Sequence, residues 1–320
     1  MTTPRPLIAP HPLITPVVFD GAAPGPCLLV LGRIHGNEPS GTIAQEAVIE
    51  RIRSGRLGIA AGAVLFVPIC NPQAAVLDRR FVDVDLNRNF RLVDPPTAYE
   101  HRLVHELAPL IDRATHVLDI HSTASETEPF IFVDVEDEAT RSFAAGLGVP
   151  NLVTGWADVY DGRTDDQDTM VLVRERGAIG LVLETGQHGD RRGPAVAERA
   201  ICQALETLGL ARLERGTGDG GGADKGACSR VFRMDRLERK PGDDAEFVKP
   251  LRNFTPVAKG EPLARRPGMA PLLAPFDGVV ILPKAHAKTG EEWFYLARPE
   301  GAVQGRADSQ TARPPLSASA

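Results

Sequence analysis

The sequence predicts an α/β domain with a mostly parallel or mixed central sheet flanked by helices, followed by a small C-terminal β-rich domain. In the first part of the chain, short apolar runs alternate with amphipathic stretches, the order typical of a sheet covered by helices. In the last part, short runs are separated by proline and glycine, which indicates an all-β unit. The first part is expected to contain strands at 27–32, 64–69, 116–120, 130–134 and 178–183 and helices at 39–53, 97–111, 140–147 and 194–213.

The first strand and the first helix are predicted from different spacings of apolar residues. Residues 27–32, Cys-Leu-Leu-Val-Leu-Gly, are continuously apolar and end at a glycine, which is typical of a buried strand. Residues 39–53 open with Pro39, which suits the first turn of a helix because its missing N–H is not needed there. Apolar residues such as Ile43 and Ile52 then recur at helical spacing, so this segment is expected to be an amphipathic helix.

A glycine-rich segment at 215–227 separates the two parts of the chain. It has no apolar period and is expected to be a flexible linker or a long loop. We therefore predict one domain over 1–214 and a β-rich domain over 228–299. Residues 300–320 are poor in apolar side chains and are expected to be disordered. The β-rich domain is expected to hold strands at 228–234, 246–248, 270–274, 278–282 and 292–297.

Composition indicates a soluble, cytoplasmic protein. The net charge of −6 and an aromatic content of 5% argue against a nucleic-acid partner. The four cysteines form no Cys-x-x-Cys pair, so reduced thiols are expected. The N-terminus has no apolar signal core, and no apolar run reaches the roughly 18 residues of a membrane span, so no membrane partner is expected. The oligomeric state stays open, a homo-oligomer included.

Four polar side chains lie just past the carboxyl ends of predicted strands. His35 and Glu38 follow the strand at 27–32, His121 follows 116–120, and Glu184 follows 178–183. If these strands are parallel neighbours, their carboxyl ends meet at one edge of the sheet. Two imidazoles and one carboxylate suit a catalytic Zn²⁺ that keeps an open position, and a second carboxylate can serve as the base. The sequence therefore predicts a zinc hydrolase site.

The order and spacing of these motifs resemble the succinylglutamate desuccinylase/aspartoacylase family of the zinc carboxypeptidase superfamily. The resemblance rests on four motifs and covers most of residues 25–190. It implies a zinc-carboxypeptidase-like fold, one Zn²⁺ per chain and hydrolysis of the amide bond of a small N-acylated, amino-acid-like substrate. The motifs are His-x-x-Glu at 35–38, Asp85-Leu-Asn-Arg88, Asp119-Ile-His-Ser122 and Glu184-Thr-Gly186.

Matched position by position, the resemblance implies a role for each of these residues. It makes His35, Glu38 and His121 the zinc ligands and Glu184 the residue that activates water. A carboxylate beside a metal can take a proton from water and later deliver it to the leaving amine. Asp119 precedes His121 by two residues on the same strand, so it lies on the same face and can orient the imidazole.

The resemblance also implies the residues that hold the substrate. Arg80 corresponds to an arginine that polarises the scissile carbonyl, Asn87 and Arg88 to a pair that holds the substrate, and Arg174 to a carboxylate-binding arginine. Guanidinium is always charged and its planar fork matches a carboxylate, which suits these roles.

Two features depart from the family pattern and leave the substrate open. Met170 stands where a tyrosine is expected four residues before Arg174. The aromatic residue expected near the C-terminus corresponds to Phe294 or Tyr295. The acyl group and the amine therefore remain undetermined at this stage.

Other histidines offer weaker metal sites. His101 and His105 are four residues apart on a predicted helix, but the glutamate that follows the first histidine in a zincin is missing. His188 follows Glu184 closely enough to reach the rim of the site. Taken alone, His35 is more often a loop histidine and Glu38 a carboxylate favoured by a helix start, and it is the other motifs that favour a metal site. His11, His116 and His286 have no partner in view and are expected to be structural.

Three alternative functions remain at this stage. The runner-up enzyme is a zinc metallocarboxypeptidase that acts on peptides. An open groove at the site would admit peptides, whereas a narrow mouth would exclude them. A zinc-binding or small-molecule-binding module without turnover is expected to lack the base, Glu184. The third is a biotinyl or lipoyl carrier, because the turns at 260–263 and 274–280 resemble such domains; Lys284, the lysine it would modify, lacks the usual flanking residues.

Overall fold

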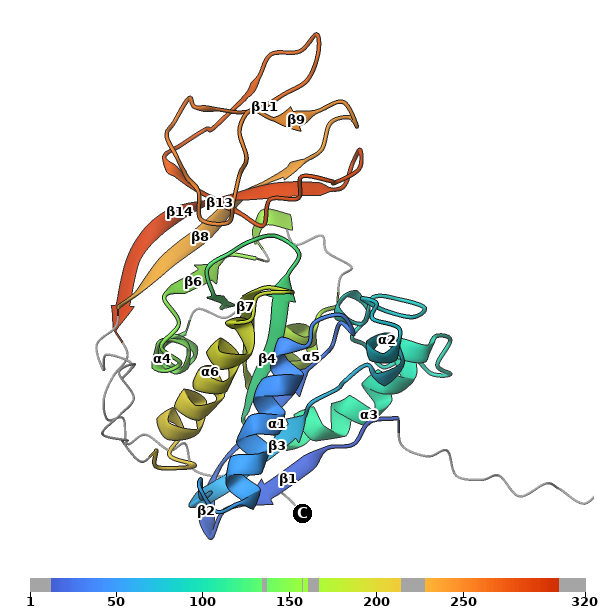
Figure 1. Ribbon diagram of the computed structural model, residues 1–320, viewed down its shortest axis with the longest axis vertical. Helices are drawn as coiled ribbons and strands as arrows, with labels where there is room; N and C mark the ends of the chain where they lie inside the picture. Colours follow the sequence, from blue (N-terminus) through green and yellow to red (C-terminus); the bar gives the residue numbers. More distant parts are fainter. Residues whose placement is uncertain (1–12, 134–136, 157, 161–166, 214–227, 305–320) are drawn as a thin grey trace, which may run out of the picture.

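The computed structural model describes residues 13–133, 137–156, 158–160, 167–213 and 228–304. Its main feature is one sheet of eleven strands in the order β1-β3-β2-β4-β7-β5-β6-β8-β14-β13-β10 (Figure 1). The neighbours β3, β2, β4 and β7 run parallel, whereas β5 is antiparallel to β7. The mixed sheet predicted from the sequence is thus confirmed. The strands are β1 (Val17–Asp20), β2 (Ala23–Gly32), β3 (Ala61–Val67), β4 (His116–Thr123), β5 (Phe130–Phe132), β6 (Asn151–Thr154), β7 (Ile179–Gln187), β8 (Cys228–Arg239), β10 (Pro256–Val257), β13 (Gly278–Ile281) and β14 (Glu292–Gln304).

Helices cover both faces of the first part of this sheet (Figure 1). Leu28 and Val30 of β2 pack into the core under α1, α4 and α6, while Leu29 and Leu31 pack into the core under α3 and α5. Both faces of β2 are therefore buried, which explains why its sequence is continuously apolar rather than alternating. The helices are α1 (Ser40–Arg53), α2 (Pro72–Val76), α3 (Tyr99–Arg113), α4 (Glu138–Gly146), α5 (Thr169–Glu175) and α6 (Gly193–Thr207), with short 3₁₀ turns η1 (Leu86–Arg88) and η2 (Asp158–Tyr160).

The C-terminal β-rich region is confirmed, but its two longest strands extend the central sheet. β8 pairs in parallel with β6, and β14 pairs with β8 along nearly its whole length. A second, small sheet, β12-β11-β9, lies beyond them (Figure 1). Phe130 and Val153 from the first part share a core with Phe232 and Tyr295 from the last part. The small sheet consists of β9 (Glu246–Phe247), β11 (Pro262–Arg265) and β12 (Leu272–Leu273).

The expected start of a disordered tail at residue 300 is too early. Strand β14 continues to Gln304, where it pairs with Cys228 of β8. Backbone pairing with β8 orders this polar end of the strand, and apolar content alone does not reveal such pairing. Residues 305–320 and the expected linker at 215–227 lie outside the described residues.

Three of the four cysteine side chains belong to the described part of the chain. Cys27, Cys70 and Cys202 are free thiols there. No helix within the described ranges is both long and apolar enough to span a bilayer.

Candidate active site

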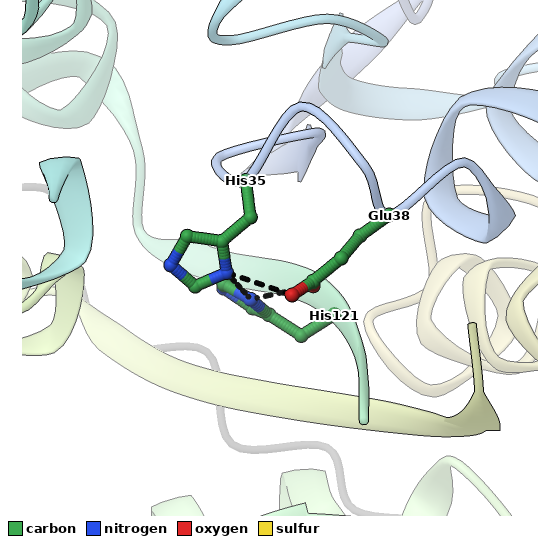
Figure 2. A group of neighbouring side chains, drawn as sticks. All are labelled: His35, Glu38 and His121. Atoms are coloured by element: carbon green, nitrogen blue, oxygen red, sulfur yellow. Dashed lines mark hydrogen bonds and ion pairs between the residues drawn. The ribbon is translucent and has the colours of Figure 1, made fainter. Parts of the chain in front are cut away.

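The polar strand ends meet at one edge of the sheet, as their positions in the sequence predict. β2, β4 and β7 are adjacent and parallel, and His121 on β4 stands opposite Glu184 on β7 in the strand register. His35 and Glu38 lie in the loop between β2 and α1. Figure 2 shows His35, Glu38 and His121 pointing toward one another.

The three side chains form a compact, buried group with the ligand atoms facing inward. His35 Nδ1 lies 2.9 Å from Glu38 Oε1, and His121 Nδ1 lies 3.1 Å from Glu38 Oε2. The two Nδ1 atoms are themselves 3.1 Å apart, and all three residues are at most 3% exposed. One ligand atom from each residue can be chosen so that all lie within 4.8 Å of one another. A buried N, N, O set so crowded suits a divalent cation, so this group could hold a metal ion.

The outer nitrogen of each imidazole faces an aspartate. His35 Nε2 lies 3.2 Å from Asp85 Oδ1, and His121 Nε2 lies 3.1 Å from Asp119 Oδ2. Carboxylates at the outer nitrogens hold the rings so that the Nδ1 atoms face each other and Glu38. The contact between Asp119 and the His121 ring agrees with the position of Asp119 two residues before His121 on the same strand. The part of Asp85 was missed, although it begins one of the motifs in the sequence.

Charges around the site shift the pKa of its carboxyl groups in opposite directions. Burial alone would raise the pKa of Glu38, but His35 and His121 hold that pKa well below its usual range, so Glu38 is ionised. Burial raises the pKa of Glu184 to about 8, against the opposing effect of His121 and Arg80. Its Oε2 atom is buried and makes no hydrogen bond within the described part of the chain. A carboxyl group of this kind is suited to exchange protons near neutral pH.

A loop between α2 and η1 brings Arg80 to the metal-ligand group. Its Nε donates to Asp85 Oδ2 at 2.8 Å, and its Nη1 lies 3.8 Å from Glu38 Oε1. Burial would raise the pKa of Asp85, but hydrogen bonds from His35 and Arg80 hold it well below its usual range. A fixed positive charge therefore stands at the side of the site.

The carboxylate of Glu100, at the start of α3, holds the loop between α2 and η1 in place. Its side chain is fully buried and accepts hydrogen bonds from the backbone N–H groups of Val82, Asp83 and Val84 at 2.7, 3.1 and 3.2 Å. Asn71 Nδ2 donates a fourth bond at 3.1 Å. One carboxylate thus fixes the backbone between Arg80 and Asp85. Sequence reasoning missed Glu100, because nothing local marks it apart from an ordinary helix-start carboxylate.

Asn87 and Arg88 lie on η1 at the same cavity. Asn87 Oδ1 accepts from the backbone N–H and the hydroxyl of Thr169 at 3.2 and 3.1 Å, which ties η1 to α5. The Arg88 guanidinium donates to the Asn87 carbonyl at 2.8 Å and lies 5.9 Å from the ring centroid of Trp156. Both residues line the cavity that also contains His35, Glu38 and His121.

The cavity has a volume of about 420 Å³ and contains most of the expected site residues. His188 also reaches it, and its Nδ1 lies 2.8 Å from Ser122 Oγ. Sequence reasoning missed several residues that line the cavity, including Phe132, Trp156 and Leu282–Lys284. The described residues that line it are His35, Glu38, Arg80, Asp85, Asn87, Arg88, His121, Ser122, Thr123, Ala124, Ser125, Phe132, Trp156, Asp168, Met170, Val182, Glu184, His188, Leu282, Pro283, Lys284 and Glu292.

Three expected residues do not reach the cavity. Arg174 is exposed in the last turn of α5 and is not among the lining residues. Arg174 was expected at the site from its spacing ten residues before Glu184. It lies on α5, the helix that borders the cavity, but the residue of that helix that lines the cavity is Met170, one turn earlier. Phe294 and Tyr295 are both fully buried in the cores on the two faces of β14. The aromatic residues that line the cavity are Phe132 and Trp156, and the Trp156 ring lies 5.5 Å from that of Tyr295 between centroids.

The alternative sites considered from the sequence do not assemble. His101 receives contacts from Thr97, and His105 is exposed and lies 2.9 Å from the Val93 carbonyl oxygen. His35, Glu38 and His121 form the one group of three suitable ligands within the residues that the structure describes. Lys284 lies at the cavity and pairs with Glu292 at 2.9 Å, rather than standing alone at a hairpin tip.

Comparison with known proteins identifies the family of this chain. Over residues 24–206 the chain matches the family model described as the succinylglutamate desuccinylase/aspartoacylase catalytic domain. A probable aspartoacylase of Parasynechococcus marenigrum is 32% identical over 206 residues, which cover 60% of this chain and 64% of that protein. A probable aspartoacylase of Prochlorococcus marinus is 31% identical over 176 residues, which cover 50% of this chain and 52% of that protein.

Solved structures share the fold over almost the whole chain. The succinylglutamate desuccinylase/aspartoacylase of Rhodobacter sphaeroides has a TM-score of 0.71 at 22% identity, covering 90% of this chain and 89% of that one. The product-bound ectoine utilization protein EutE (DoeB) of Ruegeria pomeroyi has a TM-score of 0.70 at 22% identity, covering 88% of each chain.

The mixed α/β fold is shared with the solved structures, and residues 24–206 match the catalytic-domain model of the family. The match covers more than half of the chain, and the chain belongs to the succinylglutamate desuccinylase/aspartoacylase family.

Proposed function

We propose that this protein is a zinc-dependent amidohydrolase that removes the acyl group from a small N-acylated amino acid. The observation that carries the proposal is the buried His35, Glu38 and His121 group with Glu184 on the neighbouring strand, all in one cavity. A divalent cation held by these three residues would polarise the amide carbonyl and make water a stronger acid.

The chain's own side chains supply the proton transfers. Glu184 takes a proton from the attacking water as the C–O bond forms and delivers it to the amide nitrogen as the C–N bond breaks. The products are a carboxylic acid and an amine, and the acid then gives its proton to the amine or to water, so atoms and charges balance. Arg80 stands beside the ligand group and stabilises negative charge that develops on the carbonyl oxygen. Arg88, with Asn87, holds the carboxylate of the substrate.

The shape of the cavity favours a small substrate over a peptide. Leu282, Pro283 and Lys284 from the C-terminal region form part of its lining, and about 420 Å³ suits one small molecule. A metallocarboxypeptidase needs an open groove for a chain that extends past the scissile bond. Glu184, which a binding module would not need, favours turnover over binding alone.

A metal assay and a substrate screen test this proposal together. We expect about one Zn²⁺ per chain, loss of most of it in His35→Ala and in His121→Ala, and full retention in the control His105→Ala. Full zinc occupancy in both ligand variants would place the metal elsewhere. The zinc enzyme is then assayed with N-acetyl, N-formyl and N-succinyl amino acids, with and without a chelator. Hydrolysis that persists after complete metal removal, or hydrolysis of peptides alone, would contradict the proposal.

A further inference from the structure

One side of the cavity is apolar and lies directly beside Glu184. Val182 precedes Glu184 by two residues on β7, so both side chains are on the same face of the sheet. Phe132 of β5 stands opposite Val182 in the antiparallel register, and Trp156 packs on Phe132 with 5.1 Å between ring centroids. Met170 of α5 completes this apolar wall, by which we mean Phe132, Trp156, Met170 and Val182.

The wall is preformed rather than a loose surface. The Trp156 ring contacts Phe132 on one side and the fully buried Tyr295 on another, at 5.1 and 5.5 Å between centroids. Met170 is 5% exposed and belongs to the core between the sheet and α3. Side chains held in this way can bind an apolar group without first losing conformational freedom.

The charged lining of the cavity is poorly arranged for a substrate with two carboxylates. Among the described residues that line the cavity, Arg80 pairs with Asp85 and Lys284 pairs with Glu292. Arg88 is the cation against the wall, 5.9 Å from Trp156. A second carboxylate next to the one held by Arg88 would lose its water against apolar side chains, which is costly for a charge.

The chemistry decides which half of the substrate meets the wall. Because Glu184 delivers its proton to the leaving nitrogen, the amine half of the substrate lies on the Glu184 side of the cavity. That is the side of Val182 and Phe132. Building on the proposed function, we infer that the amine half is an apolar α-amino acid, with its carboxylate at Arg88 and its aliphatic or aromatic side chain against the apolar wall.

The test compares substrates that differ only in the side chain of the amino acid. With the zinc enzyme, kcat/KM for N-acetyl-L-phenylalanine and N-acetyl-L-leucine should exceed that for N-acetyl-L-aspartate by at least about tenfold, the range that apolar pockets give. Trp156→Ala should lower kcat/KM for the phenylalanine substrate by about tenfold or more and change that for N-acetylglycine much less. Phe132→Leu, a smaller truncation, should shift the same ratio in the same direction.

A matched control is Phe247→Leu, which alters an aromatic stacked on Trp293 in another core and should leave the substrate ranking unchanged. If N-acetyl-L-aspartate or N-acetyl-L-lysine is a better substrate than N-acetyl-L-phenylalanine and N-acetyl-L-leucine, the inference is wrong while the proposed function stands. If no amide is hydrolysed, the proposed function fails, and calorimetry with L-phenylalanine and L-aspartate decides the inference. Equal or weaker binding of phenylalanine then overturns it.

Discussion

The side chains on the two sides of the cavity are held in place by different kinds of interaction. On the polar side, His35, His121 and Glu38 are placed by individual atoms, each within about 3.2 Å of a charged or hydrogen-bonding partner. On the apolar side, Trp156 and Phe132 are placed by ring contacts at 5.1 to 5.5 Å and by volume. Replacing one side chain on the polar side should therefore lower kcat for every substrate. Changes on the apolar side should instead alter the order of substrates by kcat/KM.

The largest effect is expected from Glu184→Gln. The amide keeps the shape of the side chain but cannot accept the proton of water, so kcat should fall by roughly 10²–10⁴ for all substrates alike. Steady-state kinetics on enzyme with verified zinc content measures this. Glu126→Gln is the matched control, because Glu126 is exposed and pairs with Arg252 outside the cavity lining. A wild-type rate in the Glu184 variant would assign the base elsewhere.

Arg88→Ala tests a cation that lies against the apolar wall, 5.9 Å from the centroid of the Trp156 ring. A guanidinium contact with a carboxylate contributes about 1.5–3 kcal/mol, so kcat/KM should fall roughly 10–150-fold. The loss should shrink for substrates in which the carboxylate is replaced by an amide. Arg91→Ala, three residues away and exposed, should be close to wild type. Equal losses for acid and amide substrates would mean that Arg88 maintains structure instead of binding charge.

Glu100→Gln should loosen the loop that carries Arg80 and Asp85. Its amide group would direct a donor at backbone N–H groups, which costs roughly 1–3 kcal/mol of unfolding free energy. We expect denaturant unfolding to show that loss and kinetics to show a lower kcat/KM. Glu106→Gln is a close control, because Glu106 of the same helix accepts from the backbone of Leu13 and Ile14, away from the cavity. If both variants lose stability and activity equally, Glu100 has no special part in positioning the loop.

The smallest effect concerns the other histidine of β4. Burial without a carboxylate partner lowers the pKa of His116 to about 4, whereas Asp119 and Glu38 overcome burial and raise the pKa of His121 well above its usual range. Between about pH 6.5 and 4 the unfolded chain binds a proton at residue 116 that the folded protein resists, so stability falls as pH falls. In His116→Gln the melting temperature should decline less steeply over that interval. An unchanged slope would contradict this.

The clustering of His35, Glu38 and His121 was predictable because the signal for each residue is local. An apolar strand followed by a histidine or a glutamate is visible in any window of the sequence, and parallel strands then bring the ends together. The role of Asp85 was less visible, because its contact with His35 joins residues that are 50 positions apart. Arg174 shows the limit of spacing alone, which assigned a helix correctly but not the side chain that faces the cavity.

By itself, the sequence determined the family, the order of apolar runs and the residues at the strand ends, since each depends on neighbours along the chain. The tertiary structure decided the rest. Strand β5 enters the sheet antiparallel beside β7 and thereby sets Phe132 next to Val182, and β8 and β14 extend the same sheet. No local pattern encodes which strands become neighbours, because pairing partners are chosen by packing across the whole core. The apolar wall and its contact with Arg88 exist only as a result of that choice.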